Sequence, residues 1–265
     1  MVFILGIFLC GSALITRAQE PKQGPLTPPP KRQVIRIPVD ATAAPPPIPA
    51  EEIVSQAAQK EDETFRVIGG YAFRKTIRVQ EFTEDGSASG EFQMTLEPAV
   101  AADGKRGEKV VQQATSTLRH ILLTTEDLEM LAGIPAFALI TDRLAKYEIT
   151  YAGKQQVDEL TTYLFRIKPR QLERKHAYFE GLIWVDDRDL VIVKTYGKWV
   201  TETGDVSRPD VPFTMFETYR ENVAQKLWFP AYSRSDEYLK TKKGDVHVRL
   251  TIRWTDYKPA AANKQ

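Results

Sequence analysis

The chain has 265 residues and a mass of 30.0 kDa, enough for one large β-rich domain or two domains of ordinary size. Its composition is 42% hydrophobic and 27% charged, which excludes a wholly disordered chain. Thirty-six Lys and Arg stand against thirty-five Asp and Glu, so no overall field attracts nucleic acid or an anionic surface. An electrostatic partner would need a local patch.

The first segment, residues 1–18, has the pattern of a cleaved signal peptide. Val2 to Ile15 is an apolar run of about the length of a signal core, and Thr16-Arg17-Ala18 is an acceptable cleavage site. The run is too short for a membrane-spanning helix, which needs roughly 18 or more apolar residues. We therefore expect an exported, periplasmic protein. An uncleaved N-terminal anchor and a cytosolic protein remain the alternatives.

The single cysteine, Cys10, lies inside this signal segment. It follows Ile7-Phe8-Leu9 rather than the small residues that precede a lipidated cysteine. Once the signal is removed, the protein has no thiol, which excludes disulfides, a cysteine nucleophile and zinc–thiolate sites.

Residues 19–50 form a segment rich in proline and alanine. This composition cannot build a core and favours the polyproline II conformation, which acts as a semi-stiff spacer. The segment is predicted to be a disordered linker that tethers the following domain, or alternatively a ligand for a proline-binding module.

The folded domain is predicted to span residues 51–258, followed by a disordered tail at 259–265. Residues 51–63 have helical spacing, with acidic residues at their start. Beyond them, alternation of polar and apolar residues dominates, which indicates strands. Gly70–Phe82 and a partner strand that carries Phe92, Met94 and Leu96 are predicted to pair through a turn at Glu84–Ser87.

Two short apolar helices are predicted between Thr124 and Ile140. Thr124 is a good N-cap because acidic residues fill the first turn after it, and Gly133 ends the helix. Pro135 then opens the second apolar piece.

Strands are predicted again in the second half of the chain. Lys146–Tyr151 and Glu159–Lys168 are expected to flank a turn at Ala152-Gly153-Lys154. The remaining strands are expected at Tyr178–Asp186, Leu190–Gly197, Pro212–Asn222, Leu227–Tyr238 and Asp245–Tyr257. The predicted fold class is mainly β (α+β): a large curved antiparallel half-barrel of about 9 to 11 strands, with short helices covering its concave face.

The stretch Asp186-Asp187-Arg188-Asp189 raises the question of a metal or acid/base site. In a strand only Asp187 and Asp189 would converge, and two carboxylates fall far short of a calcium cage. Asp residues between two apolar runs are typical of a hairpin turn, and this interpretation is preferred over a metal site or catalysis.

No catalytic constellation is recognisable elsewhere. The three histidines, His120, His176 and His247, lack metal-ligand spacing, and the nearest approach to a nucleophile elbow, Gly86–Gly90, has Ala88 at its centre. No glycine-rich nucleotide fingerprint is present. A Ser/His/Asp triad is not excluded by counting residues alone. We expect a protein that is not an enzyme and that uses no metal and no cofactor.

One basic cluster stands out between Lys168 and His176. Its members Arg170, Arg174 and Lys175 form either a solvated loop or a contact for lipid head groups or an acidic partner. Nucleic acid is disfavoured as a partner because no aromatic residues are interleaved with these charges.

The stretch from Phe179 to Lys194, FEGLIWVDDRDLVIVK, resembles the signature region of the LolA/LolB-like superfamily of outer-membrane lipoprotein-sorting proteins. Gly181 and Ile183-Trp184-Val185-Asp186 match the first strand of that pattern, and Leu190, Ile192 and Lys194 match the returning strand. Tyr151–Pro169 and Leu227–Tyr232 fit the same order. The resemblance implies an open half-barrel with a helical lid over an apolar hollow, and proteins that carry or sense lipids or lipid-modified proteins.

We therefore expect an exported carrier for acyl chains of lipids or lipoproteins in the bacterial cell envelope. The alternative is a tethered interaction or assembly protein with a filled core, which binds an envelope protein or a membrane surface. The predicted apolar ligand-binding face consists of Tyr71, Phe73, Ile77, Val79, Phe92, Met94, Tyr163 and Phe165. The predicted lid consists of Leu128, Leu131, Phe137 and Ile140.

Overall fold

A computed structural model describes residues 45–100, 106–174, 176–202, 204–205, 213–224, 227–241 and 244–260. The predicted signal peptide and most of the proline-rich segment, up to residue 44, lie outside the described residues, as do residues 261–265.

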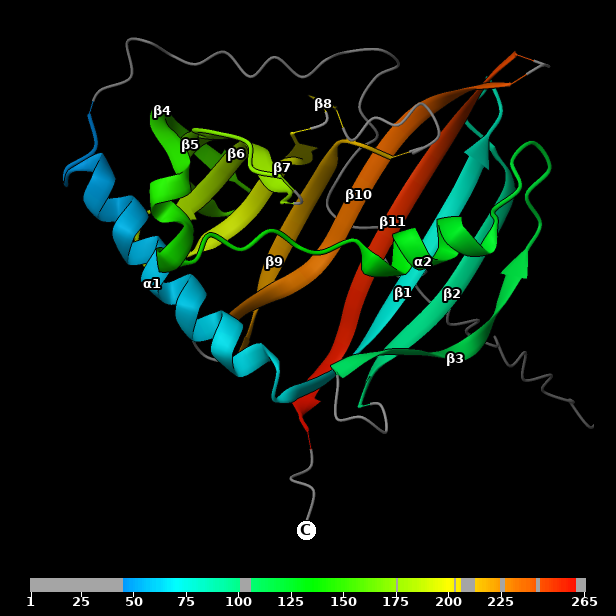
Figure 1. The fold of residues 1–265 in the computed structure, drawn as a ribbon, viewed down its shortest axis with the longest axis horizontal. Helices are drawn as coiled ribbons and strands as arrows, with labels where there is room; N and C mark the ends of the chain where they lie inside the picture. The colour runs from blue at the N-terminus through cyan, green and yellow to red at the C-terminus, as the bar shows by residue number, and fades with distance from the viewer. Residues whose placement is uncertain are drawn as a thin grey trace, which may run out of the picture.

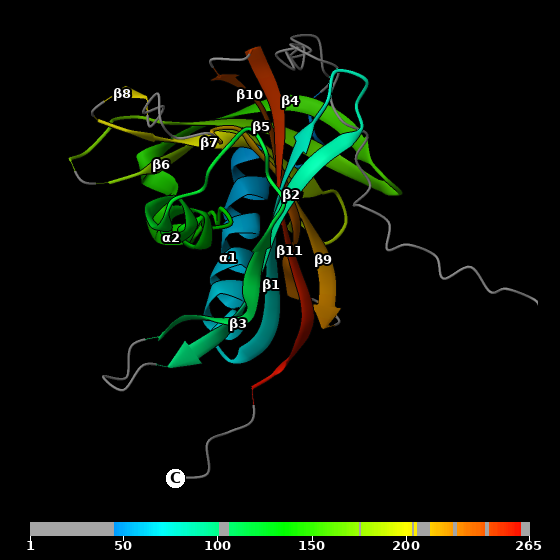
Figure 2. The same cartoon turned by 90° about the vertical axis from the view of Figure 1, so that its right-hand side faces the viewer.

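The described residues form one antiparallel sheet of eleven strands, in the order β3-β2-β1-β11-β10-β9-β7-β6-β5-β4, with β8 paired to β7 (Figure 1). In Figure 2, strands β4–β7 lie above helix α1 while β1, β11 and β9 run beside it, so the sheet curls round the helix. The predicted half-barrel with helices on its concave face is confirmed. The strands are β1 (Tyr71–Phe82), β2 (Ala88–Val100), β3 (Arg106–Ser116), β4 (Tyr147–Val157), β5 (Leu160–Pro169), β6 (Tyr178–Asp186), β7 (Ile192–Thr201), β8 (Gly204–Asp205), β9 (Phe216–Ala224), β10 (Leu227–Thr241) and β11 (Gly244–Pro259).

Helix α1 (Ala50–Ile68) crosses the concave face in front of β4–β7. Glu51 and Glu52 lie in its first turn, where carboxylates interact favourably with the helix dipole. Residues three and four apart form the face that packs on the sheet. The buried residues of this face are Ile53, Val54, Ala57, Ala58 and Glu61. The predicted helix is confirmed, and it continues five residues beyond Glu63 to Ile68.

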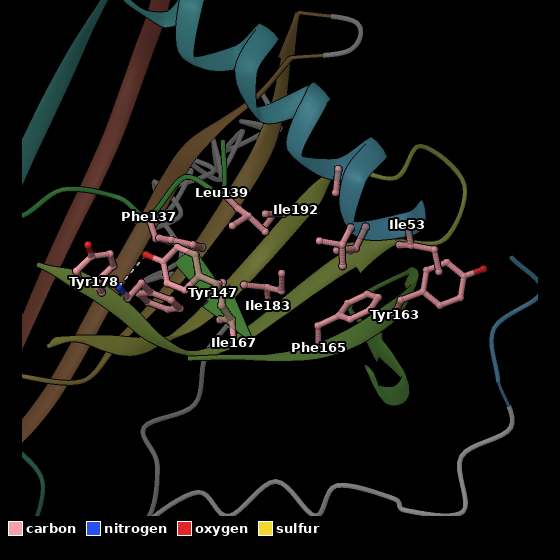
Figure 3. Packing of buried hydrophobic residues seen from close by; sticks show 14 of the residues in the cluster. Ile53, Phe137, Leu139, Tyr147, Tyr163, Phe165, Ile167, Tyr178, Ile183 and Ile192 are labelled. Atoms are coloured by element: carbon pink, nitrogen blue, oxygen red, sulfur yellow. Dashed lines mark hydrogen bonds between the residues drawn. The ribbon is translucent and has the colours of Figure 1, made fainter. Parts of the chain in front are cut away.

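A dense aromatic core fills the space between α1 and strands β4–β7 (Figure 3). Tyr163 and Phe165 point into it from β5 and are 3% and 1% exposed. Phe137 lies stacked on Phe179, with ring centroids 4.2 Å apart. A ligand placed among these side chains would have to displace them.

Helix α2 (Thr125–Gly133) covers the other half of the concave face, over β1, β2 and β11. The predicted cap is confirmed: Thr124 accepts a hydrogen bond from the Asp127 backbone N–H, and the Asp127 carboxylate accepts one from the Thr124 backbone N–H. Leu131 is fully buried beneath the helix.

The second predicted helix, at Pro135–Ile140, is absent, because this piece is extended. Proline disfavours a helical conformation of the residue before it, and Ile134 is accordingly extended with ψ of 113°. Phe137 and Leu139 are both buried, which is the period of two expected of an extended chain. A 3₁₀ helix, η1 (Thr141–Lys146), follows instead.

One prediction about the strands is wrong, and one strand was missed. The expected turn at Ala152-Gly153-Lys154 lies inside β4, where a bulge accommodates Gly153 at φ of 113°, and the chain turns at Asp158 instead, with φ of 50°. Strand β3 (Arg106–Ser116) was not predicted, and it forms one edge of the sheet beside β2.

The four residues from Asp186 to Asp189 form a hairpin turn between β6 and β7, as predicted. The Asp186 carboxylate accepts hydrogen bonds from the backbone N–H groups of Arg188 (3.2 Å) and Asp189 (2.8 Å). Leu190, with φ of 52°, completes the turn. Asp186 therefore stabilises the turn through side-chain-to-backbone bonds.

Candidate ligand-binding cavity

A cavity of about 230 Å³ lies between the C-terminal half of α1, the extended piece after α2 and the sheet. A dry engineered cavity of roughly 150 Å³ holds benzene, so this cavity has room for a short hydrocarbon segment. Most of its lining is apolar, with two tryptophans and two phenylalanines. The lining residues are Glu61, Thr64, Phe65, Ile68, Lys75, Glu108, Ile134, Pro135, Ala136, Phe137, Ala138, Arg220, Trp228, Pro230 and Trp254.

The roof of this cavity belongs to residues 118–140, which run over the concave face and include α2. We call these residues the strap. Three charged side chains of the sheet fix the strap, and all three bind its backbone; Glu81 also lies 3.2 Å from Nδ1 of His120.

The first of these is Glu81 of β1, whose side chain is fully buried. Its carboxylate accepts hydrogen bonds from the backbone N–H groups of Arg119 (2.9 Å), His120 (2.8 Å) and Ile121 (2.8 Å). Burial raises the pKa of this carboxyl, but the hydrogen bonds from the strap outweigh burial and lower the pKa below its usual value. Glu81 is therefore a charged anchor for the start of the strap.

The second anchor is Lys75, also on β1 and with its side chain 5% exposed. Its ammonium donates a 2.6 Å hydrogen bond to the carbonyl of Ala132, near the C-terminal end of α2. The same ammonium lies 3.1 Å from a carboxylate oxygen of Glu108 on β3. A cation at the end of a helix, where carbonyls lack partners, is favourable.

The third anchor is Arg220 of β9. Its guanidinium donates to the carbonyl of Phe137 in the strap and to the carboxylate of Glu61 in α1. The side chains of Arg220 and Glu61 are both only 4% exposed. Removing one member of such a buried pair leaves the other charge buried without its partner, which is strongly destabilising. Arg220 therefore ties the sheet, the helix and the strap together at one wall of the cavity.

The structure distributes the predicted site residues over two packed cores, and one of the twelve lines the cavity. Ile77, Val79, Phe92 and Met94 pack under α2 with Leu131, and Leu128 packs against the same cluster. Tyr163 and Phe165 pack under α1. Phe137 is the residue that lines the cavity. Tyr71, Phe73 and Ile140 are half-buried, with Tyr71 against Phe229 and Phe73 against Tyr257. A ligand role for the eight face residues stays a prediction.

Sequence reasoning missed the charged residues of this site, namely Lys75, Glu81 and Arg220. The signal was present: Lys75 and Glu81 occupy the same alternating positions of β1 as Ile77 and Val79. A charge in the apolar register of a strand marks a buried polar interaction.

The predicted basic patch is exposed where the structure describes it. The Arg174 side chain is 90% exposed, with its Nε 3.6 Å from a carboxylate oxygen of Glu202, and Arg170 is also exposed. Lys175 lies outside the described residues. A more open and more polar hollow of about 440 Å³, lined in part by Lys168 and Lys198, lies nearby.

Across the described ranges, no three His, Cys, Asp or Glu side chains come together as a bound metal ion would require. None of the helices in that part of the chain has the length and apolarity needed to cross a membrane.

Comparison with known proteins gives similarity at the level of fold. A scan against protein-family models and a search of curated proteins found no match. Among solved structures, the chain is similar to a LolA superfamily protein from Nitrosomonas europaea, with 14% identity, a TM-score of 0.33 and coverage of 76% of this chain and 93% of that one. It is also similar to an outer membrane lipoprotein-sorting protein domain from Vibrio parahaemolyticus, with 9% identity, a TM-score of 0.38 and coverage of 80% and 95%.

A third similar structure is the MucA/MucB complex of Pseudomonas aeruginosa, with 12% identity, a TM-score of 0.24 and coverage of 80% of this chain and 99% of that one. At these identities and TM-scores the likeness concerns the general fold.

Proposed function

We propose that the protein is an exported, non-enzymatic binding protein that holds an acyl chain of a lipid or lipoprotein between the strap and the sheet. The observation that supports this proposal is the apolar cavity under the strap, which lies between two otherwise solid cores. Proteins pack their interiors densely, so an apolar void walled by Phe65, Trp228 and Trp254 is a natural ligand site.

The energetics of binding follow from apolar burial, at roughly 25 cal/mol per Å² of surface removed from water. A cavity of about 230 Å³ accepts only part of a long acyl chain in the closed state. A longer chain therefore requires the strap to lift. No backbone N–H of residues 136–140 donates to a backbone carbonyl within the described part of the chain, so lifting the extended piece breaks no such bond and costs mainly the withdrawal of Phe137 and Leu139 from the core under α1.

The first experiment is native mass spectrometry of protein purified from the cell envelope, combined with binding of a fluorescent fatty-acid probe. We expect co-purifying lipid and saturable probe binding. Ala136→Trp fills the cavity from the strap and should reduce probe affinity at least tenfold, whereas the matched change Ala88→Trp at the exposed start of β2 should not. A lipid-free protein that also ignores the probe contradicts the proposal.

The alternative function is recognition of an envelope protein by a tethered domain. The observation that favours it is the solid packing of most of the concave face together with the exposed Arg170 and Arg174. This alternative replaces the carrier if the protein binds no lipid and instead binds an envelope protein, and if the double change Arg170→Glu and Arg174→Glu abolishes that binding.

A further inference from the structure

The two ion pairs at the cavity wall differ in how firmly the carboxylate is held. Glu61 lies on α1, its side chain is 4% exposed, and it faces Arg220 from inside the packed interface. Glu108 lies on β3, its side chain is 27% exposed, and β3 is an edge strand whose only described neighbour is β2. The Glu108 carboxylate can therefore move into solvent with little loss of free energy, whereas the Glu61 carboxylate cannot.

Lys75 keeps one hydrogen bond that does not depend on Glu108. Its ammonium is held by the Ala132 carbonyl, while its remaining N–H groups face the Glu108 carboxylate at 3.1 and 3.4 Å. No other bond of Lys75 is found among the described residues. A cation in an apolar, poorly solvated wall attracts a negative group more strongly than the same cation in water.

We propose that Lys75 is the head-group site of an anionic single-chain amphiphile and that Glu108 occupies this site in the empty protein. The ligand's carboxylate or phosphate takes the place of the Glu108 carboxylate, and its tail runs along Phe65, Ile134 and Trp254. This inference rests on the proposed function and adds the chemistry of the head group.

The energetic reasoning has two parts. A ligand anion on Lys75 makes charge-assisted hydrogen bonds, which are about twice as strong as neutral ones. The released Glu108 side chain regains its hydration at the sheet edge. Replacing Glu108 by the ligand's anion therefore costs little free energy. A neutral head group leaves Glu108 in place and gains only from its tail, and a cationic head group is repelled by Lys75.

The test compares ligands that share one tail and differ in the head: octanoate, octyl phosphate, octanol and octyltrimethylammonium. Affinities are measured by calorimetry at mildly alkaline pH, where the carboxylic acid is ionised. The native protein should bind the two anions about tenfold more tightly than octanol, and the cation more weakly than octanol. If octanoate binds more tightly than octyl phosphate, the ligand is a fatty acid; if octyl phosphate binds more tightly, it is a lipid that carries a phosphate.

Three variants make the assignment specific. Glu108→Gln removes the competing carboxylate and should raise the affinity for both anions about tenfold while leaving octanol unchanged. Glu97→Gln is the matched control, because Glu97 lies on the neighbouring strand and pairs with Arg74 on the outer face. Lys75→Met should abolish the preference for anions and retain octanol binding.

The outcomes separate this inference from the proposed function. If none of the four ligands binds, the proposed function fails. If octanol binds as tightly as octanoate and Glu108→Gln alters neither affinity, the head-group site is wrong while the acyl cavity stands. Should Lys75→Met fail to fold, the Glu108→Gln comparison decides alone, since that change lies on an exposed edge strand.

Discussion

The two halves of the concave face are closed in different ways. Under α1, strands β4–β7 are covered by interlocking aromatic and aliphatic side chains, with Phe137 and Phe179 stacked at 4.2 Å. Under the strap, the sheet still packs on α2, but the strap's backbone is also held by Glu81, Lys75 and Arg220. Where the two halves meet, a cavity remains.

This difference bears on how a binding protein can stay folded while its site opens. Interlocked side chains move only together, because a dense core is weakened by any displacement of its members. Hydrogen bonds to backbone groups can be exchanged for bonds to water one at a time. We therefore infer that the α1 half is the rigid frame, to which Phe137 and Leu139 belong, and that the part of the strap before Phe137 opens first.

The largest expected effect is the loss of a frame residue. Phe165→Ala in β5 removes a side chain that is 1% exposed, and the free energy of unfolding should fall by about 4 kcal/mol. Phe65→Ala is the control of the same type, because Phe65 is 62% exposed on α1 and its loss should change stability by less than about 0.5 kcal/mol. Urea unfolding measures both. Similar losses for the two variants would contradict a solid α1 half.

The next effect concerns the anchor of the strap. Glu81→Ala leaves three backbone N–H groups of the strap without their acceptor, and should lower the free energy of unfolding by about 3 kcal/mol. Glu159→Ala, at an exposed turn, provides the comparison and should be nearly neutral. If Glu81→Ala is as mild as Glu159→Ala, the strap does not depend on this anchor.

Acid should weaken the strap half through its buried carboxylates. On the outer face of the same half, burial raises the pKa of Asp236, but hydrogen bonds from His247 and Arg234 outweigh burial and lower that pKa to about 2. Because the pKa in the fold is below the value of about 3.9 in the unfolded chain, this stabilisation is complete above that value. It is lost as the pH falls toward about 2, a loss of about 2 kcal/mol.

Unfolding measured over a series of acidic pH values checks this expectation. Asp236→Asn should flatten the dependence of stability on pH, whereas Asp142→Asn, on the exposed 3₁₀ helix, should not. Glu81 contributes in the same direction, since its pKa is also lowered. An unchanged slope in Asp236→Asn would show that the outer network does not carry the acid sensitivity.

The smallest effect is local and leaves global stability unchanged. Backbone amides of residues 136–140 should exchange hydrogen faster than the amides of α1, because they lack backbone partners in the described structure. Hydrogen exchange read by mass spectrometry resolves the two segments. An acyl ligand should slow exchange in the strap and leave α1 unaffected. Equal protection of both segments would remove the distinction between frame and strap.

The fold was largely predictable because its strands alternate clearly. Strand β11 buries Val246, Val248, Leu250, Ile252 and Trp254 in strict alternation, so its register follows from the sequence alone. Strand β3 offered no such pattern, since it is an edge strand that places Glu108 over the concave side and leaves Val110 and Val111 exposed. Gly153 is easily mistaken for a turn residue, because a bulge needs the same positive φ as a turn does.

The candidate site was less predictable, for a reason of chemistry. An apolar residue on the inner face of a strand can pack under a helix or line a cavity, and the sequence does not distinguish these outcomes for Phe165 or Met94. The positions of the buried charges Lys75 and Arg220 would have distinguished packing under a helix from lining a cavity. A buried charge requires a partner, however, and only the tertiary structure supplies that partner. One partner of each is a backbone carbonyl of the strap, a group that every sequence possesses.

The end of β11 has a practical consequence for how this protein is handled. The Ala260 backbone N–H donates to the carbonyl of Gly70 at 2.7 Å, which brings the end of the described chain within two residues of Ile68 at the cavity. The opposite end of α1, at Ala50, is about 27 Å away along the helix axis. A fluorophore attached at Ala260 therefore lies near the cavity wall at Ile68 and should respond to a bound ligand, whereas one attached at Ala50 lies at the far end of α1.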